Sequence, residues 1–112
     1  MKIIQVIPHL GSGCAERFVV DLSNELVKQG HDVVLLTFYD LEGKYGFYKN
    51  DIDKKVRLIS LHKSIGFSIK SIGQVIKIMK HEKPDVIHSH VNSLQYTILP
   101  QVFMAKIIWY WL

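Results

Sequence analysis

The 112-residue sequence predicts a single α/β domain built on a doubly wound, mostly parallel β-sheet with helices on both faces. Short β-branched runs of the kind found in buried strands alternate along the chain with stretches of helical periodicity. Short connections between them suit crossovers that join parallel neighbours. Apolar residues make up 48% of the chain and charged residues 21%, which is typical of a folded domain.

The first part of the chain is expected to form a strand, a helix and a second strand. Residues 2–7 are nearly all apolar and β-branched, which favours a strand buried on both faces. A helix should follow over residues 14–29, with Gly30 ending it in the left-handed conformation. Residues 32–38 should form a strand parallel to the first and next to it. The helix should turn one apolar face to the core, made of Ala15, Phe18, Val19, Leu22 and Leu26.

The middle of the chain predicts a long loop, a third strand and a basic amphipathic helix. Residues 39–55 mix aromatic residues, glycines and charges, and ordered loops of this length often bind ligands. Residues 56–61 should form the third strand. The helix after it should bury residues spaced by three and four, namely Ile65, Ile69, Ile72, Ile76 and Met79. Its opposite face should be polar, with Lys70, Gln74, Lys77 and His81.

The last third begins with a strand over residues 85–90 that is apolar at its start and polar at its carboxyl end. A helix is expected to start at Asn92 or Ser93, either of which can cap it, and to run toward Pro100. Residues 107–112 fit a fifth strand. An apolar, aromatic strand exposed at a sheet edge favours aggregation, so this end indicates an interrupted chain or a contact buried by a partner.

The net charge of +4 is unevenly distributed along the chain. Residues 54–83 carry eight Lys/Arg and one Asp/Glu, whereas residues 1–53 carry five and eight. A solvated lysine face is one interpretation, and an anionic membrane surface or a phosphate-bearing substrate is the other. Cys14 is the only cysteine, which excludes an internal disulfide and favours a reducing compartment. Neither a signal peptide nor a membrane-spanning run is found, so we expect a cytoplasmic protein.

The loop between the first strand and the first helix is the first candidate site. Gly11 and Gly13 would let the backbone take positive φ and approach a ligand, where the helix start presents unpaired N–H groups to an anion. A simple tight turn is the alternative. A dinucleotide site is disfavoured because Glu16 stands where the G-x-G-x-x-G pattern has its third glycine. The thiol of Cys14 sits at a helix start, where thiol pKa values fall, although packing is its expected role.

His88 and His90, two residues apart at the end of the fourth predicted strand, form the second candidate site. Their spacing places both on one face of the strand. If the strand ends one residue early, His90 alone would turn into the ligand-binding cleft beyond the carboxyl ends of the strands. It could then act as a general base, a hydrogen-bond donor to phosphate or a buried structural residue. No metal site is expected, because a third ligand is missing from the pattern.

The motifs Pro8-His9-Leu10-Gly11-Ser12-Gly13-Cys14-Ala15-Glu16-Arg17 and Asp85-Val86-Ile87-His88-Ser89-His90 together resemble the amino-terminal domain of family 4 GT-B glycosyltransferases. The resemblance covers residues 1–100 and implies a Rossmann-like half of a GT-B fold. It also implies transfer of a sugar from a nucleotide-sugar donor to a glycan or lipid-linked acceptor, as in cell-envelope polysaccharide synthesis. No cofactor and no nucleic acid would be needed, since the nucleotide sugar is a co-substrate.

The same resemblance assigns roles to the candidate residues. Gly13, in the loop with Gly11, would lie near the donor phosphates and Glu16 on the acceptor side. His90 would be the cleft histidine near the reacting sugar, with His88 as its structural neighbour. Cys14 replaces the second glycine of the family motif and could crowd the donor phosphate. The Lys63–Lys83 region would dock on the inner face of an anionic membrane.

The family's carboxyl-terminal, donor-binding half has no counterpart in residues 1–112, so we expect an acceptor-side domain that is apparently truncated and inactive alone. A split enzyme, with the donor-binding half supplied as a separate subunit, is one alternative. A non-catalytic Rossmann-like binding or adaptor module is the other.

Overall fold

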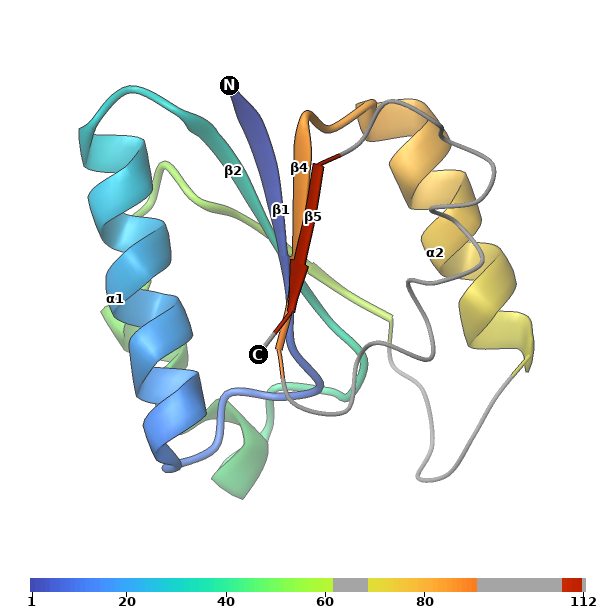
Figure 1. Ribbon diagram of the computed structural model, residues 1–112. Coiled ribbons are helices and arrows are strands. Elements are labelled where there is room, and N and C mark those ends of the chain that lie inside the picture. Colours follow the sequence, from blue (N-terminus) through green and yellow to red (C-terminus); the bar gives the residue numbers. More distant parts are fainter. Residues whose placement is uncertain (62–68, 91–107, 112) are drawn as a thin grey trace.

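The computed structural model describes residues 1–61, 69–90 and 108–111, the last four as backbone only. Strands and helices alternate along these residues (Figure 1). In chain order the elements are β1 (Lys2–Val6), α1 (Cys14–Lys28), β2 (Asp32–Thr37), the 3₁₀ turns η1 (Gly43–Gly46) and η2 (Lys49–Asp51), β3 (Arg57–Ser60), α2 (Ile69–Glu82), β4 (Val86–Ser89) and β5 (Ile108–Trp111).

The sheet has the strand order β3-β2-β1-β4-β5, and every neighbouring pair is parallel. In Figure 1, α1 covers one face of this sheet and α2 covers the other, which confirms the predicted doubly wound architecture. The chain passes from β1 to β2 on one side, whereas β4 lies on the other side of β1. The carboxyl ends of β1 and β4 therefore flank the point where the strand order reverses, the usual ligand-binding position in open α/β sheets.

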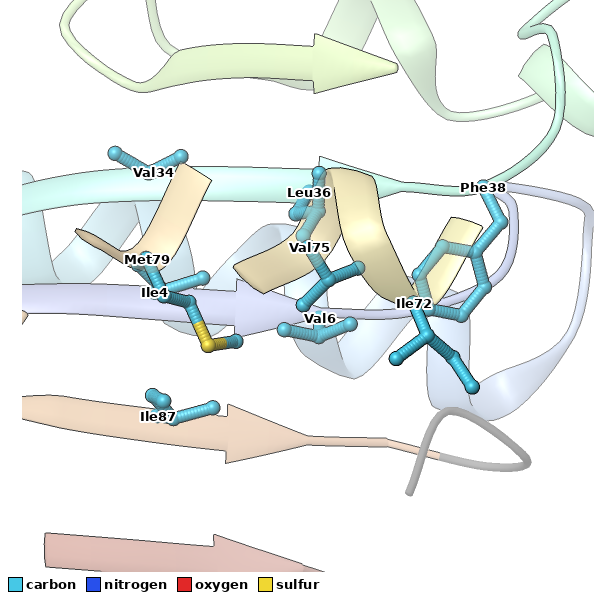
Figure 2. Close-up of a cluster of buried hydrophobic side chains, with 9 residues drawn as sticks. All are labelled: Ile4, Val6, Val34, Leu36, Phe38, Ile72, Val75, Met79 and Ile87. Carbon is cyan, nitrogen blue, oxygen red and sulfur yellow. The ribbon is translucent and has the colours of Figure 1, made fainter. Parts of the chain in front are cut away.

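A hydrophobic core fills each face of the sheet because the strands are apolar on both sides. The core under α2 is shown in Figure 2 and consists of Ile4, Val6, Val34, Leu36, Phe38, Ile72, Val75, Met79 and Ile87. The core under α1 consists of Ile7, Leu10, Val19, Val20, Val27, Val33, Leu35, Leu41 and Val56. This burial on both faces confirms the prediction made from the continuous β-branched runs.

Among the described residues, the predicted apolar faces are wrong at one position in each helix, because Phe18 of α1 is 47% exposed and Ile69 at the start of α2 is 78% exposed. Ile65 lies outside the described residues. In α1, Val19 is buried as predicted and Ala15 and Leu26 pack on the core, while Glu16, Val20, Ser23 and Val27 are buried as well. Small and β-branched side chains let the helix approach the sheet closely, which leaves the larger aromatic ring at the side of the interface. The polar face of α2 is exposed at Lys70, Lys77 and His81 as predicted.

The connections follow the predictions. Gly30 has φ +94° and ends α1 in the left-handed region. The loop over residues 39–55 contains η1 and η2, and it is held to Leu10 by two backbone hydrogen bonds. The Leu10 N–H donates to the Tyr45 carbonyl at 2.9 Å, and the Leu10 carbonyl accepts from the Tyr48 N–H at 3.1 Å. This loop therefore lies against the segment that follows β1.

β5 pairs in parallel with β4 at the edge of the sheet, which confirms the predicted fifth strand. The helix expected between Asn92 and Pro100 lies outside the described residues. Within the part of the chain that the structure describes, no helix combines the length and apolar character needed to cross a bilayer.

The amino-terminal ends of the strands are tied to the end of α2 by ion pairs. The Arg57 Nη2 atom lies 2.7 Å from Glu82 Oε1 and 3.1 Å from Asp32 Oδ1. The Lys2 ammonium lies 3.4 Å from the same Glu82 oxygen. Hydrogen bonding by Arg57 holds the pKa of the Glu82 carboxyl below its usual value. This network is at the opposite end of the sheet from both candidate sites.

Candidate functional site

The glycine loop begins where β1 leaves the sheet, and its start is bonded to the end of β2. The Pro8 carbonyl accepts hydrogen bonds from the Phe38 N–H at 3.0 Å and the Tyr39 N–H at 3.1 Å. Gly11 is buried, and its N–H donates to His9 Nδ1 at 3.0 Å. A Cβ at Gly11 would press on the His9 ring and on the Lys44 carbonyl. Glycine is needed here for close packing.

Neither Gly11 nor Gly13 has the positive φ that we expected of them. Gly13 is the N-cap of α1 with φ −79° and ψ 168°, an extended conformation open to any residue. What a side chain would meet at Gly13 is the Glu16 carboxylate, which folds back over the helix start. Glu16 is 9% exposed. The loop therefore places this carboxylate beside the glycine.

Cys14 is the first residue of α1, and its side chain is exposed. Its φ is not positive, so the backbone here accepts a side chain without strain. No side chain caps this end of the helix, and the first helical hydrogen bond runs from the Arg17 N–H to the Gly13 carbonyl at 3.2 Å. The N–H groups of the first turn have no intrahelical acceptor, which makes this end attractive to an anion.

His90 lies immediately after β4, at the same end of the sheet as the glycine loop. Its N–H donates to the Val6 carbonyl at 2.8 Å, so the residue is aligned with the last residue of β1. Its ring is 2% exposed, and Nε2 lies 2.7 Å from Oε1 of Gln5, which is equally buried in β1. The glycine loop and His90 thus both follow the carboxyl ends of adjacent parallel strands, β1 and β4, at the same end of the sheet.

His88 and His90 share one face of β4, as predicted, and their ring centroids are 3.9 Å apart. β4 does end one residue early, at Ser89, but His90 does not turn into a cleft alone. The prediction of that turn is wrong because the hydrogen bonds to Val6 and Gln5 continue the strand's alternation. The Phe18 ring of α1 meets the His90 ring edge-on, with the centroids 6.2 Å apart.

The pKa values of both imidazoles are lowered. Burial, and to a lesser degree the charge of His88, lowers the pKa of His90 to about 4. Burial alone lowers the pKa of His88. At neutral pH His90 is therefore an uncharged group that can donate one hydrogen bond and accept another, and it is not a cation. In residues 1–61 and 69–90, no three His, Cys, Asp or Glu side chains meet in a geometry that could hold a metal ion.

Aromatic residues border the glycine loop on the side of β2. The rings of Tyr39 and Tyr45 stack with centroids 5.5 Å apart, and His9 packs 4.9 Å from Tyr45. The Lys44 ammonium lies 5.3 Å from the centre of the Tyr45 ring. Apart from His9, the members of this cluster come from the loop over residues 39–55, for which the sequence predicts ligand binding. The cluster lies directly beside Gly11.

Sequence reasoning missed two residues of the site, Gln5 and Phe18. Gln5 was visible as the one polar residue among the apolar residues 3–7. Its partner His90 could not be inferred, because the register between β1 and β4 is a property of the folded sheet. Phe18 was assigned to the core by its helical spacing, whereas it packs on His90 at the side of α1.

The model of Glycosyltransferase Family 4 matches residues 13–104 of the chain. A curated relative from Campylobacter jejuni is 34% identical over 99 residues, which are 83% of this chain and 26% of the relative. Its name is GalNAc-alpha-(1->4)-GalNAc-alpha-(1->3)-diNAcBac-PP-undecaprenol alpha-1,4-N-acetyl-D-galactosaminyltransferase. The chain thus spans about a quarter of the length of this relative.

Two solved structures show the same fold. A glycosyltransferase from Rickettsia africae superposes with a TM-score of 0.70 at 16% identity, over 98% of this chain and 28% of that one. A deacetylase of teicoplanin biosynthesis superposes with a TM-score of 0.54 at 11% identity, over 94% of this chain and 62% of that one. At these identities the likeness concerns the fold alone.

Proposed function

This chain belongs to glycosyltransferase family 4, and from that premise we propose that it forms the acceptor-side wall of a sugar-transfer cleft. The reaction would move a sugar from a nucleotide-sugar donor to a lipid-linked or glycan acceptor. One observation carries the proposal: a glycine loop opening a helix and a buried histidine lie together at the carboxyl ends of β1 and β4. The lipid-linked substrate in the name of the Campylobacter relative supports the choice of acceptor.

In this reaction the bond between the anomeric carbon and the donor phosphate oxygen breaks, and the nucleotide leaves with the electron pair. The acceptor hydroxyl oxygen bonds to that carbon, and its proton passes to the departing phosphate oxygen. Charge grows on the departing phosphate. The N–H groups at the start of α1 would favour that charge, provided that the donor displaces the Glu16 carboxylate that lies beside Gly13. Gly11 and Cys14 would border the same phosphate site. A donor-binding half, in the same protein or as a separate subunit, would complete the cleft.

His90 and Glu16 would face the sugars. His90 is uncharged at neutral pH, so we assign it hydrogen bonding to a hydroxyl of the transferred sugar rather than proton transfer. Glu16 lies beside Gly13 and would accept a hydrogen bond from the acceptor. His88 packs on the His90 ring and would hold it in place.

A specific observation favours a second candidate, a non-catalytic binding module. The His90 ring is 2% exposed, as expected of a structural histidine. A transferase instead requires that ligand binding or a second domain open a path to this ring. The two candidates therefore differ in whether His90 affects transfer.

A chimeric enzyme distinguishes them. This chain would replace the matched 99-residue segment of the Campylobacter relative, and transfer of radiolabelled N-acetylgalactosamine to its lipid-linked acceptor would be measured. We expect transfer by the chimera and a loss of at least about a hundredfold in its His90→Ala version. Thr37→Val, at a buried residue at the end of β2, is the matched control. A folded chimera that binds donor but transfers no sugar would contradict the proposal.

We further propose that α2 docks on the inner face of an anionic membrane. Its exposed side carries Lys70, Lys77 and Lys80, followed by Lys83. Each lysine near an anionic surface contributes about 1 kcal/mol of attraction. The chain should co-sediment with phosphatidylglycerol vesicles at low salt, and the Lys70→Glu/Lys77→Glu variant should bind at least about tenfold more weakly. Equal binding by the variant, or equal binding to neutral vesicles, would exclude this surface.

A further inference from the structure

Gln5 is a buried polar side chain in an apolar strand. Its neighbours Ile4 and Val6 belong to the core under α2. Gln5 itself points to the opposite face, where it is 1% exposed and in register with His88 of β4. Burying an amide in such surroundings is costly unless hydrogen bonds replace those lost to water. The partner of Gln5 therefore matters both for stability and for function.

That partner is His90. The 2.7 Å contact joins the amide oxygen of Gln5 to Nε2 of the imidazole. A carbonyl oxygen can only accept a hydrogen bond, so Nε2 must carry the proton. The ring is uncharged at neutral pH, which means that it carries one proton and that Nδ1 keeps its lone pair. The contact with Gln5 thus selects one of the two neutral tautomers.

Two further contacts restrict how the ring can turn. The His88 ring lies 3.9 Å away and Phe18 meets the imidazole edge-on at 6.2 Å, measured between centroids. The backbone N–H of His90 is fixed to Val6. With its backbone and one nitrogen hydrogen-bonded and two rings packed beside it, the imidazole is pre-organised before any ligand binds.

We propose that Gln5 is a positioning residue that holds His90 as the Nε2–H tautomer and so makes Nδ1 the atom that accepts a hydrogen bond from a hydroxyl of the bound sugar. The tautomer is independent of the reaction, whereas the role of Nδ1 rests on the proposed transferase function. Loss of the Gln5 acceptor should free the ring to turn and to exchange its proton with water.

Nuclear magnetic resonance of the chain with ¹⁵N-labelled histidine tests the first part. The His90 spectrum should show the proton on Nε2, protected from exchange with water. Gln5→Met keeps the size of the side chain but removes the acceptor, and it should speed this exchange by at least about tenfold. Gln5→Glu retains an acceptor oxygen and should preserve the protected proton. Thr37→Val, which removes a buried hydroxyl that has no hydrogen-bond partner among the described residues, should leave the His90 signals unchanged.

A proton on Nδ1 in the unsubstituted chain, or equal protection in Gln5→Met, would overturn the proposal. The wild-type spectrum alone decides the tautomer if Gln5→Met does not fold. In the transferase chimera, Gln5→Met should lower kcat about tenfold with little change in the donor KM, and Gln5→Glu should recover part of the loss. An altered His90 spectrum with unchanged kcat would overturn the role of Nδ1 and leave the tautomer assignment standing. A chimera inactive in every form would contradict the proposed function instead.

Discussion

At the scale of single residues, burial determines the chemistry that His90 can perform. An exposed histidine titrates near neutral pH, but this one is enclosed by Gln5, His88 and Phe18, and its charged form loses solvation. The result is a neutral hydrogen-bonding group at the edge of the sheet. Such a group is suited to orienting a sugar hydroxyl and unsuited to electrostatic attraction of phosphate, which the start of α1 is placed to supply.

The lowered pKa of His90 predicts a pH-dependent stability. In the unfolded chain the imidazole has its ordinary pKa of 6.5, and burial in the folded chain lowers the pKa to about 4. The unfolded state therefore binds more protons between these values, and the stabilisation present above pH 6.5 is lost as the pH falls toward 4. His90→Gln should reduce this loss when the free energy of unfolding is measured with denaturant at pH 7 and pH 5. An equal loss of unfolding free energy between pH 7 and pH 5 in both proteins would show that His90 is not buried as described.

The contact between Gly13 and Glu16 leads to a second prediction at the scale of single residues. Because the backbone of Gly13 suits any residue, alanine there should only displace the Glu16 carboxylate and lower the free energy of unfolding by less than about 1 kcal/mol. In a Glu16→Ala background the same substitution should have no effect, and the double-mutant cycle measures the difference. Additive effects of the two substitutions would mean that the carboxylate does not lie against the glycine.

At the scale of elements, α2 is joined to the sheet in two ways, through its apolar side and through its last residue. Its apolar side packs on the strands through Ile72, Val75 and Met79 (Figure 2). Its last residue, Glu82, accepts hydrogen bonds from Arg57 of β3 and Lys2 of β1. β4 begins four residues after this anchor, at Val86, and ends at Ser89, directly before His90.

Removal of the Glu82 charge should consequently destabilise the fold. Glu82 is 8% exposed at its side chain while Arg57 is about half exposed, so we expect Glu82→Gln to lower the free energy of unfolding by about 1–2 kcal/mol at pH 7. Because the pKa of Glu82 is lowered in the folded state, the difference should shrink as the pH falls below 4.5. Glu25→Gln on the exposed side of α1 is the matched control and should change stability little. Equal effects of the two substitutions would argue against the anchor.

The helix faces show where sequence reasoning stops at this scale. Spacing by three and four residues identifies α1 as amphipathic, but the predicted stripe includes the exposed Phe18, and Ser23 and Val27 of the adjacent stripe are buried. The choice between them depends on how closely the helix approaches the sheet. Side-chain volume decides that distance, and periodicity carries no information about it.

At the scale of the whole molecule, the parallel sheet brings the two candidate sites together. The alternation of strands and helices predicted this architecture. Because parallel strands all end on the same side, whatever their order, the architecture also places Gly13 and His90 at one end of the sheet. The contact between Gln5 and His90 could not be predicted, since it depends on β1 and β4 being adjacent and on their register.

A spin label on Cys14, the only cysteine of the chain, tests this convergence most directly. The label would stand at the start of α1, beside Gly13. We expect it to broaden the imidazole signals of His90 and His88 strongly. His31 follows the far end of the helix, which spans about 22 Å, and should be affected much less. A diamagnetic label on the same thiol serves as the reference. Signals of His90 that stay as sharp as those of His31 would place the glycine loop and the histidine at opposite edges of the sheet and contradict the account.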